Sequence, residues 1–255
     1  MDVNSILGEA KRLKASDVHF IPGIKPELRI NRDLIALDQY SPISKEDILE
    51  VYDFFLKGNV DKDAFYREHK VLDTSAEFDG IRLRVNISCS DGLPVITTRL
   101  IRNELPTYEE LGVPDIVRRM TNQPQGLILV TGKTNSGKST TLNALINYIN
   151  DNENKKILTL ESPVEYKHKC KKSIIVQKEV GIGGDVPAYS IGTKNSLRED
   201  CDILIIGEIR DKETMEAAIE TAESGHLVIG TLHTKSCAET VDRMINFYEV
   251  GDHKD

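Results

Sequence analysis

The stretch LILVTGKTNSGKSTTLNAL, residues 127–145, decides the fold expected for the second half of the chain. An apolar run is broken by G-x-x-x-x-G-K-S at 132–139, and apolar residues then recur at helical spacing. Glycines let backbone N–H groups turn toward an anion, and the helix that follows points its positive end at the same place. The pattern predicts a phosphate-binding loop in which Lys138 reaches the β- and γ-phosphates and Ser139 ligates Mg²⁺.

The residues of this loop, and of the helical turn after it, are the expected contacts to a nucleotide. They are Gly132, Thr134, Asn135, Ser136, Gly137, Lys138, Ser139 and Thr140. Asn135 stands where a further glycine is common, and asparagine tolerates the positive φ that such a turn requires. The sequence therefore predicts nucleotide binding here before any reaction is considered.

Apolar strand candidates alternate with helical segments through this half of the chain. They occupy residues 127–131, 157–160, 174–177, 203–206 and 227–231. Near-continuous apolar strands separated by helices predict a mostly parallel sheet covered on both faces, which is an α/β fold.

The first hundred residues have a different pattern. Apolar residues at helical spacing open the chain, and SDVHFIPG at 16–23 is typical of a strand that ends in a turn. Hairpins are predicted around residues 31–33 and at Asp79-Gly80, and Ser44 is a candidate helix cap. We therefore expect a small α+β domain at 1–102, a linker at 103–115 and the α/β domain at 116–255.

Composition excludes several classes of protein. The 255-residue chain has a net charge of -8, which argues against a general nucleic-acid binder. Its apolar runs are too short to span a bilayer, and its first residues lack the apolar core of a signal peptide. Four cysteines without metal-ligand spacing fit free thiols in a reducing cytoplasm.

Two carboxylates and a histidine follow predicted strands of the parallel sheet. Glu208 and Glu161 each lie where a strand ends, the edge at which ligands collect in such sheets. Gly207 occupies the place of the aspartate that usually precedes a catalytic glutamate, so contact with the metal must come from elsewhere or through water. Glu165, four residues after Glu161, is a weaker candidate. His233 follows the last strand and is either structural or a neutral sensor of the γ-phosphate.

Taken together, the motifs resemble the secretion ATPase superfamily, the hexameric motors of type IV pili and type II secretion. The phosphate loop is followed in the family's order by LESPVE at 160–165, LREDCDILIIGEIRD at 197–211 and GHLVIGTLHT at 225–234. ASDVHF at 15–20 and RLRVN at 82–86 are also similar to family signatures. The similarity covers nearly the whole chain and is greatest to the pilus-retraction (PilT-like) branch.

The resemblance implies a PAS-like N-terminal domain followed by a RecA-like ATPase domain, with ATP and Mg²⁺ bound. It implies that Glu208 polarises the attacking water, that Glu161 lies near metal and water, and that His233 lies near the γ-phosphate. Of the N-terminal-domain arginines that match the family, Arg82, Arg84 and Arg99, we assign the last two to the nucleotide.

The resemblance also implies partners and a location. We expect a homo-oligomer, a hexamer, at the cytoplasmic face of the membrane, without insertion into the bilayer. Its expected partner is the inner-membrane platform protein of the pilus, with no direct contact to nucleic acid. The resulting function is ATP-driven pilus retraction and twitching motility.

Three departures from the family keep alternatives open. Ser162 replaces an aspartate of the acidic motif, Cys201 replaces a proline, and the chain ends soon after VDRMINFYEV, before the C-terminal part of the family's ATPase domain. The alternatives are an extension, secretion or DNA-uptake motor, or an ATP-binding regulator with weak turnover. A P-loop kinase or GTPase is less favoured, since no guanine-specificity motif is evident.

Overall fold

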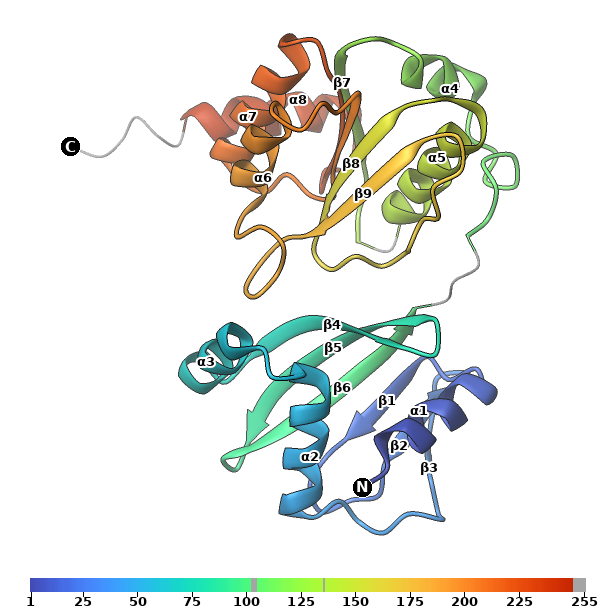
Figure 1. Cartoon of the computed structure of the whole chain (residues 1–255), viewed down its shortest axis with the longest axis vertical. Helices are drawn as coiled ribbons and strands as arrows, with labels where there is room; N and C mark the ends of the chain where they lie inside the picture. Colours follow the sequence, from blue (N-terminus) through green and yellow to red (C-terminus); the bar gives the residue numbers. More distant parts are fainter. Residues whose placement is uncertain (102–104, 135, 250–255) are drawn as a thin grey trace, which may run out of the picture. The chain divides into compact units, whose positions relative to one another are not determined.

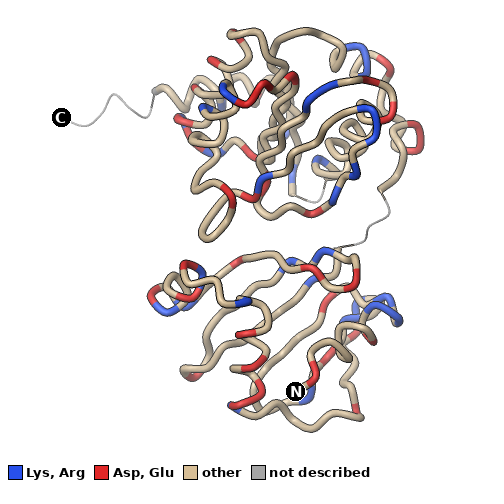
Figure 2. The backbone as a smooth tube through the Cα atoms, viewed as in Figure 1, with Lys and Arg blue, Asp and Glu red and all other residues tan. Residues whose placement is uncertain are grey.

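The computed structural model describes residues 1–101, 105–134 and 136–249 of the chain. It divides into two compact units, Met1–Asn103 and Glu104–Asp255. Acidic and basic residues are interspersed along the backbone of both units (Figure 2). Within the described ranges, no helix combines the length and the apolar character needed to cross a bilayer.

Unit 1 is built on an antiparallel sheet of strand order β3-β2-β1-β6-β5-β4. One face of the sheet packs against α1 and α2 through a single apolar core (Figure 1). The elements are α1 (Val3–Arg12), β1 (Asp17–Phe20), β2 (Glu27–Ile30), β3 (Asp33–Ala36), α2 (Lys45–Leu56), α3 (Val60–His69), β4 (Leu72–Phe78), β5 (Ile81–Ser90) and β6 (Leu93–Ile101).

The predicted features of unit 1 are confirmed at the local level. The opening helix forms, and both hairpins turn where expected, at 31–32 and at Asp79-Gly80. Ser44 caps α2 in a reciprocal capping box with Asp47, which satisfies two backbone donors that the helix itself leaves unpaired. The sequence prediction did not include α3 or β6.

Unit 2 is built on a wholly parallel sheet of strand order β7-β11-β10-β8-β9. The predicted strands are confirmed, and so is the α/β fold class. The elements are α4 (Asp115–Thr121), β7 (Gly126–Thr131), α5 (Lys138–Asn152), β8 (Lys156–Glu161), β9 (Ile174–Glu179), α6 (Tyr189–Ser196), β10 (Ile203–Ile206), α7 (Lys212–Glu223), β11 (Leu227–Leu232) and α8 (Cys237–Glu249).

Helices cover both faces of this sheet, which explains why its strands are apolar throughout. Alternate strand residues join two separate cores, because successive side chains point to opposite faces. One core is closed by α5, and the other by α7 and α8 (Figure 1). The parallel arrangement places the carboxyl ends of all the strands along one edge, and the loops at that edge carry the candidate site.

The connection between β8 and β9 is tied to α5 by a row of asparagines. Asn143, Asn147 and Asn150 share one face of the helix because they are four and three residues apart. Asn143 Oδ1 lies 2.7 Å from His168 Nε2, and Asn147 Oδ1 lies 2.7 Å from His168 Nδ1. Asn150 Nδ2 donates to the carbonyl oxygen of Lys169 at 2.8 Å.

Stability is expected to fall between pH 6.5 and pH 4 through His168. Burial lowers the pKa of His168 to about 4 from its ordinary 6.5. The unfolded chain therefore takes up a proton that the folded chain excludes. The contribution of His168 to the free energy of unfolding is complete above pH 6.5 and is lost as the pH falls toward 4. This contribution amounts to about 3 kcal/mol. Denaturant unfolding across this range should show a flatter pH slope for His168→Gln than for the parent chain.

A slope of the opposite sign would contradict this assignment. It would mean that the two amide oxygens facing the ring hold it protonated, so that the pKa is raised rather than lowered. A neutral ring has one nitrogen that donates and one that accepts. Rotating the Asn147 amide by half a turn lets its nitrogen donate to Nδ1 of the neutral His168 ring.

Candidate functional site

The loop between β7 and α5 has the geometry of an anion site. Gly137 adopts φ 96°, a left-handed conformation that favours glycine, and it stands at the N-terminus of α5. No side chain in the described part of the chain caps this helix, and its first turn holds no acidic residue. The N–H groups of that turn are therefore not used by a cap and suit phosphate oxygens. Asn135 lies outside the described residues.

Lys138 closes the loop from within. Its Nζ donates to the carbonyl oxygens of Gly132, at 2.8 Å, and of Lys133, at 3.0 Å. Burial lowers the pKa of Lys138, while the charge of Glu208 acts in the opposite direction. The ammonium group is thus only partly hydrated and gains a strong partner when an anion enters the loop.

Lys138, His233 and Glu208 form a continuous chain of contacts. Lys138 Nζ lies 3.4 Å from His233 Nδ1, and His233 Nε2 lies 3.0 Å from Glu208 Oε1. An ammonium group only donates, so Nδ1 accepts, and the ring proton is assigned to Nε2, which donates to the carboxylate. The structure therefore brings together the predicted phosphate lysine, the predicted sensor and the predicted catalytic glutamate.

Arg210 completes the surroundings of Glu208 and was not among the predicted site residues. Its Nη2 donates to Glu208 Oε2, while His233 occupies Oε1. Burial raises the pKa of Glu208, but the hydrogen bond and charge of Arg210, with smaller effects of His233 and Lys138, lower it overall. The carboxylate, 17% exposed, is therefore ionised and held at both oxygens. The sequence signal that could have identified Arg210 is a basic residue two positions after a glutamate at the end of a strand.

Glu161 ends β8 at the same edge of the sheet, and its setting differs from that of Glu208. Burial raises the pKa of Glu161, and hydrogen bonds from Thr159 and Gln177 lower it in part. Thr159 Oγ1 donates at 2.6 Å and Gln177 Nε2 at 3.0 Å, both to Oε1. Glu161 is thus a desolvated carboxylate in a fixed orientation, which would bind a cation strongly.

The residues present fit Mg²⁺ better than a metal held by protein alone. In residues 1–101, 105–134 and 136–249, no three His, Cys, Asp or Glu side chains gather closely enough to hold a metal ion. Mg²⁺ is usually held by one or two carboxylates together with substrate phosphates and water. Ser139 and Glu161 would supply the protein's share.

Gly207 is required by packing between strands, which accounts for its place before Glu208. A Cβ atom built there would lie 2.9 Å from the carbonyl oxygen of Leu160 and 3.4 Å from Glu161 Cα. Gly207 also donates its N–H to that same carbonyl at 2.8 Å. An aspartate does not fit at this position without moving β10 away from β8.

Gly207→Ala is therefore expected to destabilise the chain by about 1–3 kcal/mol, the usual range for overpacking. Denaturant unfolding measures the loss. Gly8→Ala is the control, because its added methyl would meet only the ring of Phe78, at 4.0 Å. Equal unfolding midpoints for the two variants would contradict the packing argument.

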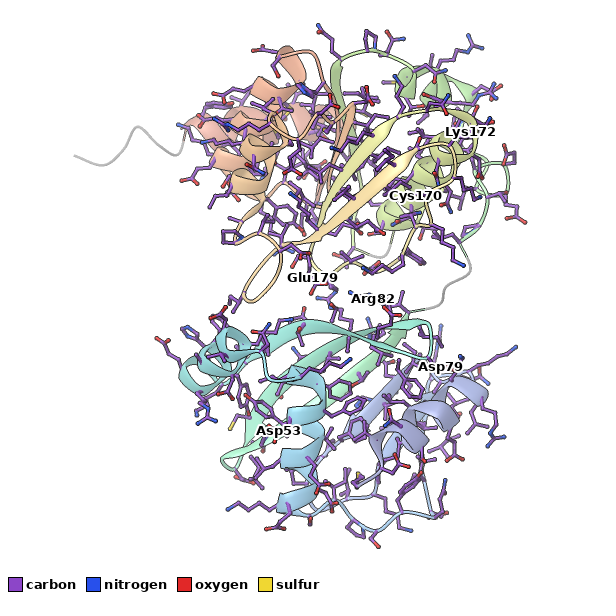
Figure 3. The ribbon with its side chains drawn as sticks, in the orientation of Figure 1. Asp53, Asp79, Arg82, Cys170, Lys172 and Glu179 are labelled. Atoms are coloured by element: carbon purple, nitrogen blue, oxygen red, sulfur yellow. The ribbon has the colours of Figure 1, made fainter. Side chains whose placement is uncertain are left out.

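Arg84 and Arg99 belong to unit 1, where they lie directly opposite each other on β5 and β6. Arg99 Nε donates to Asp17 Oδ1 at 2.9 Å, and Arg84 forms an ion pair with Asp73. Arg82, labelled in Figure 3, donates to Ser75 Oγ at 2.7 Å. The contact of Arg84 and Arg99 with a nucleotide stays a prediction.

Comparisons with known proteins find related sequences and a related solved structure. The model of the type II/IV secretion system protein family matches residues 71–250. The type IV pilus retraction ATPase PilT of Pseudomonas aeruginosa is 38% identical over 97% of this chain and 71% of its own length. A twitching motility protein of Neisseria gonorrhoeae is 37% identical over 89% of this chain and 60% of its own length. The crystal structure of the pilus retraction motor PilT with bound ADP superposes with a TM-score of 0.89 at 35% identity, over 99% of this chain and 73% of that one.

Proposed function

The chain belongs to the type II/IV secretion system protein family, and we propose that it is an ATP-hydrolysing motor subunit that drives retraction of a type IV pilus. The contact chain from Lys138 through His233 to Glu208 carries the proposal, because it joins a phosphate lysine to a carboxylate suited to orient water. The relatives named for pilus retraction and twitching motility favour retraction over the other branches of the family.

The loop between β7 and α5 and the first turn of α5 bind the nucleotide. Lys138 exchanges its bonds to the carbonyls of Gly132 and Lys133 for bonds to the β- and γ-phosphates. The proposed contacts to the phosphates are made largely through backbone N–H groups. They come from Gly132, Thr134, Asn135, Ser136, Gly137 and Thr140. Ser139 and Glu161 would hold Mg²⁺, which would supply positive charge to the phosphate oxygens.

Hydrolysis requires Glu208 to give up one of its present partners. Its two oxygens are held by His233 and Arg210, so neither is fully available to a water molecule. A γ-phosphate beside Lys138 lies on the Nδ1 side of His233 and favours the neutral ring that carries its proton on Nδ1 and donates it to the phosphate, so that Nε2 no longer donates to Glu208. That exchange releases Oε1 of Glu208 to accept a proton from the attacking water, and His233 thereby reports the γ-phosphate to the catalytic carboxylate.

The assembly that we propose is a hexamer, in which Arg84 and Arg99 supply positive charge to the nucleotide from another domain or subunit. A planar guanidinium suits the charge that spreads over a phosphoryl group during its transfer. The ring acts at the cytoplasmic face of the membrane on the platform protein of the pilus.

Retraction and extension are distinguished by deletion of the gene in its own host. A retraction motor predicts cells with excess pili and no twitching, whereas cells without pili would select extension. A regulator with weak turnover is the second candidate, since Ser162 removes a charge beside Glu161. It predicts tight nucleotide binding without hydrolysis at any protein concentration.

A further inference from the structure

A path of partly buried hydrogen bonds joins the start of α5 to Glu161. It begins at Asn143, whose Nδ2 donates to the carbonyl oxygen of Ser139 at 2.8 Å. Because that amide nitrogen is used, Asn143 turns its Oδ1 toward His168 Nε2, 2.7 Å away. Asn143 is 4% exposed, so this orientation is fixed by partners rather than by solvent.

The same histidine directs the second half of the path through its backbone. The N–H of His168 donates to Gln177 Oε1 at 2.9 Å. The amide nitrogen of Gln177 is thereby turned toward Glu161 Oε1, at 3.0 Å, and toward the carbonyl oxygen of Tyr166, at 2.7 Å. His168 thus orients two side chains: Asn143, which contacts the backbone carbonyl of Ser139, and Gln177, which contacts the carboxylate of Glu161.

The rest of the connection is fastened to α5 by contacts that do not join this path. Asn150 accepts from the N–H of Lys171 at 2.9 Å and donates to the carbonyl of Lys169 at 2.8 Å. Figure 3 marks Cys170 and Lys172 in this part of the connection, alongside α5. These contacts fasten the connection but touch neither Ser139 nor Glu161.

We propose that His168, acting through Asn143 and Gln177, is a positioning residue that fixes the Glu161 carboxylate relative to Ser139 for Mg²⁺ binding. The inference rests on the proposed function, because it takes these two residues as the metal ligands. Partners of this kind orient the groups that hold a metal, and their loss typically lowers metal affinity or activity about 10–100-fold.

The test compares ADP binding with and without Mg²⁺ by calorimetry, so that the metal's contribution is read apart from hydrolysis. His168→Ala and Gln177→Met should reduce the Mg²⁺-dependent gain in ADP affinity at least about tenfold. The affinity for ADP in EDTA should be unchanged. His168→Gln should restore most of the gain, because an amide reaches Asn143 in place of Nε2.

Asn150→Ala is the matched control, since it loosens the same connection at its other end. It should lower the unfolding midpoint and leave the Mg²⁺-dependent gain intact. An equal loss of the gain in Asn150→Ala, or no loss in Gln177→Met, overturns the proposal. Failure of the parent chain to bind ADP would instead contradict the proposed function, so the two failures are distinguishable.

Discussion

Replacement of Lys138 by alanine is expected to lower ATP turnover by at least about 10²–10³-fold, the usual cost of losing one donor that stabilises transition-state charge. Lys138 links the phosphate loop to the other site residues, because its Nζ contacts a loop carbonyl on one side and His233 on the other. Its loss removes both the phosphate contact and the start of the path to Glu208. Release of inorganic phosphate in the steady state measures the effect.

Lys133→Ala is the control for Lys138→Ala, because it removes a positive charge from the same loop. The side chain of Lys133 is exposed, and its carbonyl oxygen, which contacts Lys138, is retained. Turnover should change only a few-fold, as expected for loss of a solvated charge. Equal losses in the two variants would show that the loop responds to charge in general and not to the position of Lys138.

Glu208→Gln is expected to separate binding from hydrolysis. The amide has nearly the same shape but cannot accept a proton from water, so turnover should fall about 10²–10⁴-fold, the range for loss of a general base. Nucleotide binding should persist, because Lys138 and the start of α5 are unchanged. Calorimetry with ATP and a phosphate-release assay on the same preparation measure both quantities.

Glu216→Gln serves as the comparison for Glu208→Gln. Glu216 lies on α7 and forms an ion pair with Lys212 at 3.9 Å, with both side chains well exposed. Its replacement should leave turnover unchanged. Retention of hydrolysis in Glu208→Gln would transfer the catalytic role to another carboxylate, with Glu161 the first to test.

Local signals made much of this fold predictable from the sequence. The strands of unit 2 are short apolar runs, and the phosphate loop has fixed residues at fixed spacing, so neither depends on distant contacts. By contrast, α3 has a single buried residue, Tyr66, and thus almost no apolar stripe to indicate a helix. Its position is set by packing against the rest of unit 1.

The sequence identified the candidate site residues of unit 2, but it did not predict their contacts with one another. The sequence placed Glu208 and His233 at strand ends, whereas the contact between them depends on the register between β10 and β11. The roles of His168 and Gln177 depend on how the β8–β9 connection folds back on α5. No spacing rule relates those residues, so only the folded chain identifies them.

The central claim, that this chain is an ATPase that works as an assembled motor, is tested most directly by measuring hydrolysis against oligomeric mass. Phosphate release from Mg-ATP should be recorded across protein concentration, with the mass distribution determined in the same samples. The account predicts that turnover per chain rises together with the hexamer fraction and disappears in Lys138→Ala. Absence of Mg²⁺-dependent hydrolysis at every mass, or the same turnover in monomer and hexamer, would contradict it.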